Sequence, residues 1–293
     1  MTSFGGVRGL GVSHGLDLTD LDHTTSQEID AHLMDAWSAR QPLYTMYATS
    51  LMTDYAPKFA KLSRWGSDLF ASDAENVLML AVQNMHSYMM QGWETGIRNT
   101  FHTLHRNGLN TAQMMEIVMF SQLYAGMRGL GHVYHAGGDL LPVMGPPRRS
   151  PAFPEGWAPD PAAFQAGLDM STREMTRQDV DNLTAWYQRT LGFLPNSIAY
   201  GLKLNPQFVK INRAKWESAI VTLPKQVAPY LLLRHHTSVG SVEGLREAVL
   251  LARAWGMSNE WIMRGIVGTV MYFTGTEGLY TVYNALHDLP DFF

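Results

Sequence analysis

The sequence predicts an all-α fold made of two tandem helical repeats, and three observations support this prediction. Apolar residues recur at helical spacing along the 293-residue chain, whereas the period-two alternation of strands is scarce. Half of the 14 prolines lie between residues 142 and 161, where they block helix continuation and indicate a connector. The parts of the chain before and after this connector share a sequence pattern, which indicates internal duplication.

The shared pattern is clearest near the end of each part. Residues 126–136 read GMRGLGHVYHA and residues 275–285 read GTEGLYTVYNA, with six of the eleven positions identical at an offset of 149 residues. Upstream, residues 106–110 face residues 254–258 at an offset of 148 residues. A common period with a one-residue slip favours duplication over chance.

The pattern divides the chain into an N-terminal arm (1–25), a first helical repeat (26–136), a Pro-rich connector (137–163) and a second helical repeat (164–293). Apolar spacing, together with cap and stop signals, places the helices within each repeat. In the first repeat we expect helices over residues 26–40, 75–91 and 93–107, and a further one from residue 111 onward. In the second repeat we expect a helix over residues 176–191 and another that begins at Ser258.

The composition excludes several classes of function. The net charge of −4 shows no basic excess, so neither nucleic acid nor an anionic membrane is an expected partner. The chain has no cysteine, which excludes disulfides, thiol catalysis and Cys-ligated metal centres. We find no signal segment and no apolar run long enough to span a bilayer, so we expect a cytoplasmic protein. Only 16% of the residues are charged, which suits a homo-oligomer that buries surface between subunits.

Three short motifs lie at the ends of the helices of the first repeat. They read Gly-Trp-Glu-Thr-Gly at 92–96, Arg-Asn-Gly-Leu at 106–109 and Tyr-Ala-Gly at 124–126. This arrangement resembles the carboxymuconolactone decarboxylase and alkylhydroperoxidase D-like superfamily, and the second repeat shows a fainter version of it. The resemblance implies two tandem alkylhydroperoxidase D-like helical repeats that oligomerise and form sites between helices and subunits.

The departures from the family pattern limit the chemistry. Peroxidase members carry Cys-x-x-Cys followed by His, and the matching positions here are Trp93, Gly96 and Thr100, or Ser241, Gly244 and Ala248 in the second repeat. Without a thiolate, thiol peroxidase activity is excluded. Decarboxylase members carry Glu-Leu-x-x-His, whose histidine position is Thr100 here, while Glu94 lies close to the family glutamate.

One helix face of the first repeat differs from its counterpart. Arg128, His132 and His135 follow i, i+4, i+7 spacing beside Tyr124, and the second repeat has Glu277, Thr281 and Asn284 at the matching positions. Positions that differ between the two repeats are not required by the shared fold, so their residues can have a functional role. Arg128 could bind a carboxylate while an imidazole moves a proton near neutral pH. The alternative is a solvated or subunit-facing surface.

A further histidine lies near the end of the first helix in each repeat. His86 precedes Gly108 by 22 residues, and His235 and His236 precede Gly256 by 21 and 20. Tyr88 and Trp93 lie near His86, and an apolar aromatic pocket with few polar groups is typical of a small-molecule site. The alternative for His86 is a hydrogen-bonded core residue.

These observations together predict a carboxymuconolactone decarboxylase-like enzyme that needs no cofactor. It would perform proton-transfer chemistry (decarboxylation, isomerisation or ring opening) on a small cyclic acid or lactone from aromatic catabolism. The expected catalytic residues are His132, His86 and Glu94, and the expected substrate-binding residues are Arg128, Tyr124, His135 and Trp93. Two alternatives stay open: a divalent metal ion held by His132 and His135, or a non-catalytic member that binds a small ligand or a protein partner.

Overall fold

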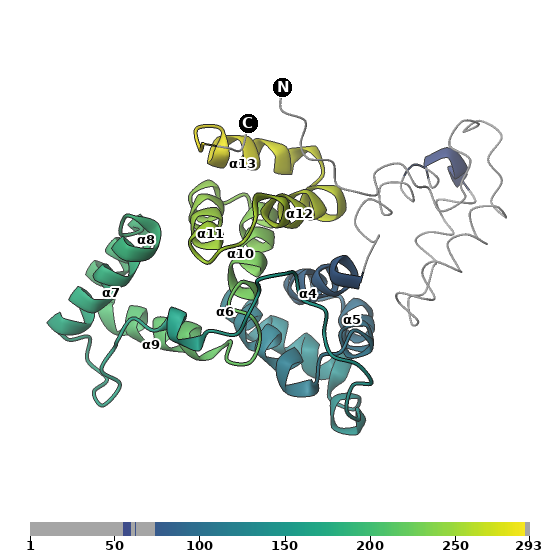
Figure 1. Cartoon of the computed structure of the whole chain (residues 1–293), viewed down its shortest axis with the longest axis horizontal. Helices are drawn as coiled ribbons and strands as arrows, with labels where there is room; N and C mark the ends of the chain where they lie inside the picture. Colours follow the sequence, from purple (N-terminus) through teal and green to yellow (C-terminus); the bar gives the residue numbers. More distant parts are fainter. Residues whose placement is uncertain (1–54, 60–61, 63–73, 291–293) are drawn as a thin grey trace. The chain divides into compact units, whose positions relative to one another are not determined.

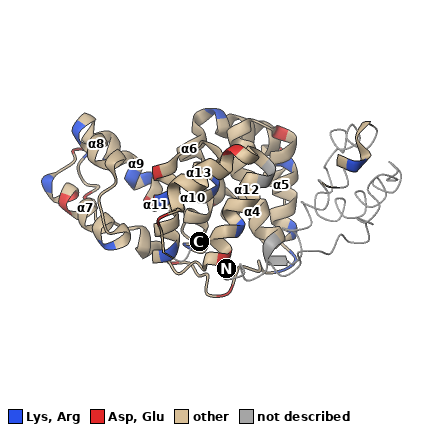
Figure 2. Cartoon of the chain, turned by 90° about the horizontal axis from the view of Figure 1, so that it is seen from above, with Lys and Arg blue, Asp and Glu red and all other residues tan. Residues whose placement is uncertain are grey.

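The computed structural model describes residues 55–59, 62 and 74–290, and within these residues every regular element is a helix (Figure 1). The all-α expectation is confirmed for this part of the chain. None of the described helices combines the length and apolar character needed to cross a bilayer. The expected arm (1–25) and the expected helix over residues 26–40 lie outside the described residues. Charged side chains are sparse along the described helices, as Figure 2 shows.

The chain forms two compact units. The described parts of unit 1 are residues 55–59, 62, 74–111 and 131–153, and those of unit 2 are residues 112–130 and 154–290. Residues 112–130 therefore belong to unit 2, although the sequence analysis grouped them with the first repeat. Each unit has a core of its own.

Unit 1 is built from α4 (Ala74–Gln91), α5 (Glu94–Arg106) and the end of α6 (Thr111–Gly137), followed by a loop that contains η1 (Leu141–Val143). α4 packs against α5, and the expected helices over 75–91, 93–107 and from residue 111 are confirmed. Apolar side chains spaced along both helices are fully buried, among them Leu78, Val82, Met85, Ile97, Phe101 and Leu104. Arg98 fastens the end of α6, because its guanidinium donates to the Ala136 carbonyl and to the Asp139 carboxylate.

α6 is kinked at Gly126. This glycine has φ 66° and ψ −168°, a conformation that is essentially restricted to glycine. The kink divides the helix between Tyr124 and Arg128, so the helical spacing that the sequence analysis used for this face does not continue across Gly126.

Unit 2 contains most of the remaining helices, which are gathered as the green and yellow elements of Figure 1. In chain order they are η2 (Pro161–Phe164), α7 (Arg177–Leu191), α8 (Asn196–Leu204), α9 (Pro206–Ser218), α10 (Val227–Ser238), α11 (Val242–Ala254), α12 (Asn259–Thr269), the π-helix η3 (Val270–Thr274) and α13 (Thr276–Leu286). The expected helices over 176–191 and from Ser258 are confirmed. Thr176 and Asp179 form a capping box at the start of α7, and the Ser258 hydroxyl caps α12.

The core of unit 2 combines an aromatic cluster with buried charge pairs. Phe164 packs against Trp216 and Trp255, with ring centroids 4.9 and 4.7 Å apart. Lys210 and Asp179 form an ion pair in which each side chain is 1% exposed. α10 lies at the centre, packed against α11 and α12, and most of its side chains are buried.

The same local geometry occurs twice along the chain. Arg98 bonds to Ala136 and Asp139, and Arg246 bonds in the same way to the Ala285 carbonyl and the Asp288 carboxylate. The glycines of the shared sequence pattern have positive φ at both matching places, in the pairs Gly92 and Gly240, Gly108 and Gly256, and Gly126 and Gly275. The π-helix lies where the sequence offset changes from 148 to 149 residues, and a π-helical turn accommodates one extra residue.

Candidate functional site

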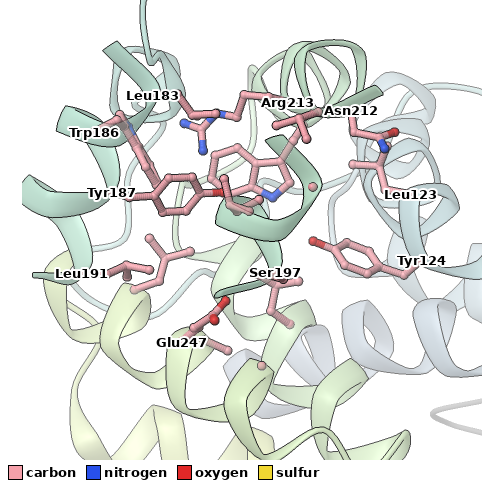
Figure 3. A pocket seen from close by; sticks show the side chains of 18 of the residues that line it. Leu123, Tyr124, Leu183, Trp186, Tyr187, Leu191, Ser197, Asn212, Arg213 and Glu247 are labelled. Carbon is pink, nitrogen blue, oxygen red and sulfur yellow. The ribbon is translucent and has the colours of Figure 1, made fainter. Parts of the chain in front are cut away.

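Unit 2 contains a cavity of about 370 Å³. Side chains from α6, α7, α8, α9, α10 and α11 line it, and its walls are mainly apolar and aromatic, with Trp186, Trp216 and Phe208 among them. A few polar groups reach into the cavity, including Tyr124, Tyr187, His236 and Glu247. Figure 3 shows the hydroxyl groups of Tyr124 and Tyr187 directed inward from opposite sides, with the Glu247 carboxyl entering from α11. An apolar cavity with a few convergent polar groups is typical of a small-molecule site.

Helical spacing on α11 places Glu247 in the cavity. Gly244, Glu247, Ala248 and Leu251 line it because positions three and four residues apart share one helix face. Leu245, Val249 and Ala252 are also buried, so they hold α11 in place from its other sides. The Ser241 hydroxyl, which accepts a hydrogen bond from the Gly244 N–H, caps the start of this helix.

The Glu247 carboxyl has the electrostatic property expected of an acid–base group. Burial raises its pKa to about 7, and the negative charge of Glu243 adds to the shift. Both the protonated and the ionised form are therefore populated near neutral pH. A carboxyl with such a pKa can take and return a proton within one reaction cycle.

The two tyrosines of the cavity keep their protons at physiological pH. Burial raises the pKa of Tyr124 well above its usual range, and it raises the pKa of Tyr187 as well. Each hydroxyl can therefore donate a hydrogen bond to an oxygen atom of a bound molecule.

The histidines beside Tyr124 are neutral. Burial lowers the pKa of His235 to about 4, and burial together with His235 lowers the pKa of His236 to about 4. The His236 ring borders the cavity, and its Nδ1 atom is buried without a hydrogen-bond partner among the described residues. A Cβ atom at Gly244 would overlap this ring, so glycine at this position makes room for the imidazole.

Among the described residues that line the cavity, the one arginine is already paired. The Arg213 Nε donates to the Glu217 carboxylate over 2.8 Å, and the guanidinium stacks on Trp186 with 3.8 Å to the ring centroid. Its positive charge is thus compensated within the wall. With Glu247 half protonated and the histidines neutral, the lining of the cavity carries little net charge near pH 7.

The residues expected from the sequence are divided between the two units. In unit 1, the Nδ1 atom of His132 lies 2.9 Å from the Glu94 Oε1, and the Nδ1 of His135 lies 3.9 Å from the same oxygen. The three side chains are 26%, 45% and 67% exposed for His132, Glu94 and His135. His132 also lies against Gly92, where a Cβ would come within 2.6 Å of its Nε2.

The other expected residues have different surroundings. His86 lies on α4 and is buried in the core of unit 1, with 1% of the residue exposed. Trp93 packs edge-on against Tyr88, with ring centroids 4.6 Å apart. Arg128 is exposed, whereas Tyr124 lines the cavity of unit 2. The described residues contain no group of three or more His, Cys, Asp or Glu side chains placed to share a metal ion.

Glu247, Tyr187 and Trp186 were not predicted from the sequence as site residues. Two signals pointed to the region without identifying these residues: the His235-His236 pair before Gly256, and the family position at Ala248, which directly follows Glu247. The segment over residues 176–191 was recognised only as a helix, since nothing in its local spacing indicates which distant helix it contacts.

Comparison with protein-family models, curated protein sequences and solved structures gave no match.

Proposed function

We propose that this chain is an enzyme that transfers protons on a small cyclic molecule without a redox cofactor, and that the cavity of unit 2 is its active site. The observation that carries the proposal is the Glu247 carboxyl, with a pKa of about 7, in an aromatic cavity of about 370 Å³. The reaction class is the one expected from the sequence, and Tyr124 keeps its expected place in the site. Glu247 replaces the residues that were expected to transfer the proton, which were His132, His86 and Glu94. Membership of the carboxymuconolactone decarboxylase-like superfamily stays a prediction.

The duplication predicted from the sequence supports this choice of site. The paired arginine contacts and the matching glycine geometry are what two copies of one helical unit would retain. On this reading, the copy of Glu247 in the first repeat is Asn99, a buried residue that cannot ionise. The carboxyl is then present in the second repeat alone. Because the helical unit folds without it in the first repeat, we infer that Glu247 serves the function and not the fold.

The proposed reaction uses the two kinds of polar group in the cavity. The ionised Glu247 removes a proton from a carbon atom next to a carbonyl, and the electron pair of the C–H bond moves onto the carbonyl oxygen as an enolate. The Tyr124 hydroxyl donates a hydrogen bond to that oxygen, which stabilises the developing charge in a water-poor environment. The protonated Glu247 then returns a proton to the same or a neighbouring carbon.

The charge of the cavity favours a neutral substrate. The only guanidinium among its described lining residues is paired with Glu217. A carboxylate that enters an apolar space without a free counter-charge loses its hydration at a high free-energy cost. Of the two substrate classes expected from the sequence, a lactone or similar neutral carbonyl compound therefore suits this cavity better than an acid.

A proton-exchange experiment tests the proposal. The probe is 2-coumaranone, a neutral aromatic lactone with acidic hydrogens next to its carbonyl, incubated in D₂O and followed by proton NMR. We expect the protein to accelerate loss of the C–H signal, and Glu247→Gln to lower this rate by about 100-fold or more. Glu277→Gln, which changes an exposed carboxylate on α13, is the matched control and should exchange like the unmodified protein.

Binding is measured separately from exchange. Trp186 and Trp216 line the cavity, so 2-coumaranone should quench the tryptophan fluorescence of both the unmodified protein and Glu247→Gln. Its ring-opened anion, 2-hydroxyphenylacetate, should quench far less. Equal exchange rates for the unmodified protein and Glu247→Gln would refute the role of this carboxyl, and an absence of quenching would refute the choice of cavity.

A second candidate is proton transfer at the Glu94–His132 pair of unit 1, which the contact of 2.9 Å favours. A carboxylate that accepts a hydrogen bond from one imidazole nitrogen orients the ring and leaves its other nitrogen to take the proton. If this pair is the active site, His132→Gln abolishes exchange in the same experiment and Glu247→Gln leaves it unchanged.

A further inference from the structure

His236 lines the cavity of unit 2, and the proposed reaction gives it no role. We propose that the His236 imidazole donates a hydrogen bond to the carbonyl oxygen of the bound molecule, as a second donor beside the Tyr124 hydroxyl. The inference rests on the proposed function, because it takes the ligand of this cavity to be a neutral carbonyl compound. It makes His236 a residue that selects molecules with a carbonyl group.

Close packing holds the His236 ring in the wall of the cavity. The ring comes from α10, and a Cβ atom at Gly244 on α11 would lie 2.2 Å from its Nδ1 atom. Gly244 and Glu247 both line the cavity, and three residues span about 4.5 Å along a helix. The imidazole therefore borders the cavity about one helical turn from the proposed base. A small molecule can contact the imidazole with its carbonyl oxygen and the carboxyl with the neighbouring C–H group.

Tyr124 approaches the same ring from α6. The centroids of the Tyr124 and His236 rings are 6.3 Å apart, and the two rings are nearly perpendicular. At this separation, polar groups on both rings can reach one oxygen atom, because each hydrogen bond spans about 2.7–3.0 Å. Two preorganised donors stabilise a developing enolate oxygen more strongly than one.

The imidazole has a proton to donate. Burial and the neighbouring His235 lower the pKa of His236 to about 4, so at physiological pH one ring nitrogen carries a proton and the other a lone pair. Nδ1 is buried and has no hydrogen-bond partner within the described part of the chain. Buried N–H groups without an acceptor are rarer in proteins than unsatisfied acceptors, which favours the tautomer with the proton on Nε2. The Nε2–H group is then the donor that a bound oxygen can use.

The first repeat supplies an internal comparison. Gly96 follows Tyr88 by eight residues, as Gly244 follows His236. A Cβ at Gly96 would overlap the Tyr88 ring, just as a Cβ at Gly244 would overlap the imidazole. In the predicted duplication, an aromatic ring packed on a glycine is therefore common to both copies, whereas the imidazole and the Glu247 carboxyl belong to the second copy. The packing explains a ring at this position but not its nitrogen atoms.

A matched pair of ligands tests the hydrogen bond. 2-Coumaranone and 2,3-dihydrobenzofuran share one bicyclic skeleton and differ in the carbonyl group, and isothermal titration of the full chain measures the affinity of each. His236→Phe keeps a ring on Gly244 but removes the N–H group. We expect this variant to weaken 2-coumaranone binding by about three- to tenfold, which corresponds to one neutral hydrogen bond. Binding of 2,3-dihydrobenzofuran should stay unchanged.

Two further variants serve as controls. His236→Gln retains an N–H donor and should keep most of the preference for 2-coumaranone. His287→Phe replaces an exposed histidine at the end of α13 and should bind both ligands like the unmodified protein. Melting curves of each variant confirm that the chain is folded.

The outcomes separate this inference from the proposed function. Equal weakening of both ligands by His236→Phe would overturn the inference, since that result describes packing alone, and so would unchanged binding of both. Selective weakening of 2-coumaranone, in a protein that does not exchange its hydrogens, would support the hydrogen bond and refute the proposed reaction. The absence of 2-coumaranone binding by the unmodified protein would overturn both.

Discussion

The ammonium group of Lys210 lies 2.8 Å from the Asp179 carboxylate, and both side chains are almost completely buried. Lys210 also donates to the Glu174 carbonyl, while Asp179 accepts hydrogen bonds from the N–H groups of Asp169 and Thr176. This network links the start of α7 to α9. Both helices line the cavity, and α7 supplies Trp186 and Tyr187 to it.

Removing only one partner of this pair should destabilise the protein strongly. Lys210→Met leaves the Asp179 carboxylate buried without its counter-charge, which should lower the free energy of unfolding by about 3–5 kcal/mol. Urea unfolding followed by tryptophan fluorescence measures the change. Lys215→Met alters an exposed lysine of the same helix and should have little effect. A loss for Lys210→Met no larger than that for Lys215→Met would contradict the assigned role of the pair.

The same network predicts a loss of stability in acid. Burial alone would raise the pKa of Asp179, but hydrogen bonds from Lys210 and the neighbouring N–H groups hold it well below its usual range. Because the folded carboxyl binds protons less readily than the unfolded one, its stabilisation is complete above about pH 4–5 and is lost as the pH falls further. The free energy of unfolding, measured between pH 7 and 3, should fall less steeply for the double variant Asp179→Asn/Lys210→Met. Parallel pH profiles would show that other groups determine the acid response.

The contribution of Glu247 to the free energy of unfolding should depend on pH in the opposite sense to that of Asp179. Its pKa is raised in the folded protein, so the unfolded state releases its proton more readily, and the group costs stability as the pH rises past its unfolded value of about 4.3. Glu247→Gln should therefore raise the free energy of unfolding at pH 8 and leave it nearly unchanged at pH 4. Glu243→Gln, which removes the neighbouring negative charge, should lower the Glu247 pKa, as measured by carbon NMR of the carboxyl group. An unchanged titration in that variant would show that burial alone sets this pKa.

The kink of α6 should depend on its glycine. At Gly126 a Cβ atom would meet nothing within 4 Å, so the cost of Gly126→Ala is backbone strain alone, about 1–3 kcal/mol. Gly131 lies in the same helix, is exposed and also has open space around it, and there Ala should stabilise by about 0.5–1 kcal/mol. Thermal melting of the two variants in parallel measures both effects. If both variants raise the melting temperature, a side chain at Gly126 does not strain the backbone there.

Much of the helical structure could be predicted from local patterns. The starts of α7 and α12 follow from the cap residues Thr176 and Ser258, and the ends of α4 and α5 follow from the glycine stops at Gly92 and Gly108, because these signals act within a few residues of one another. The kink at Gly126 could not be predicted in this way. Its sequence context is compatible with a continuous helix, and glycine only permits the observed backbone conformation without requiring it.

The candidate site residues also differ in whether local sequence signals could predict them. By itself, the sequence determined the all-α class, the absence of thiol chemistry and the repeated pattern of residues, since these depend on composition and short-range spacing. It also indicated Glu94 and His132, which the fold brings into contact. Only the tertiary structure decided that Tyr124, Tyr187 and Glu247 line one cavity. Their helices are distant in sequence, and the raised pKa of Glu247 arises from burial by residues that no local pattern connects to it.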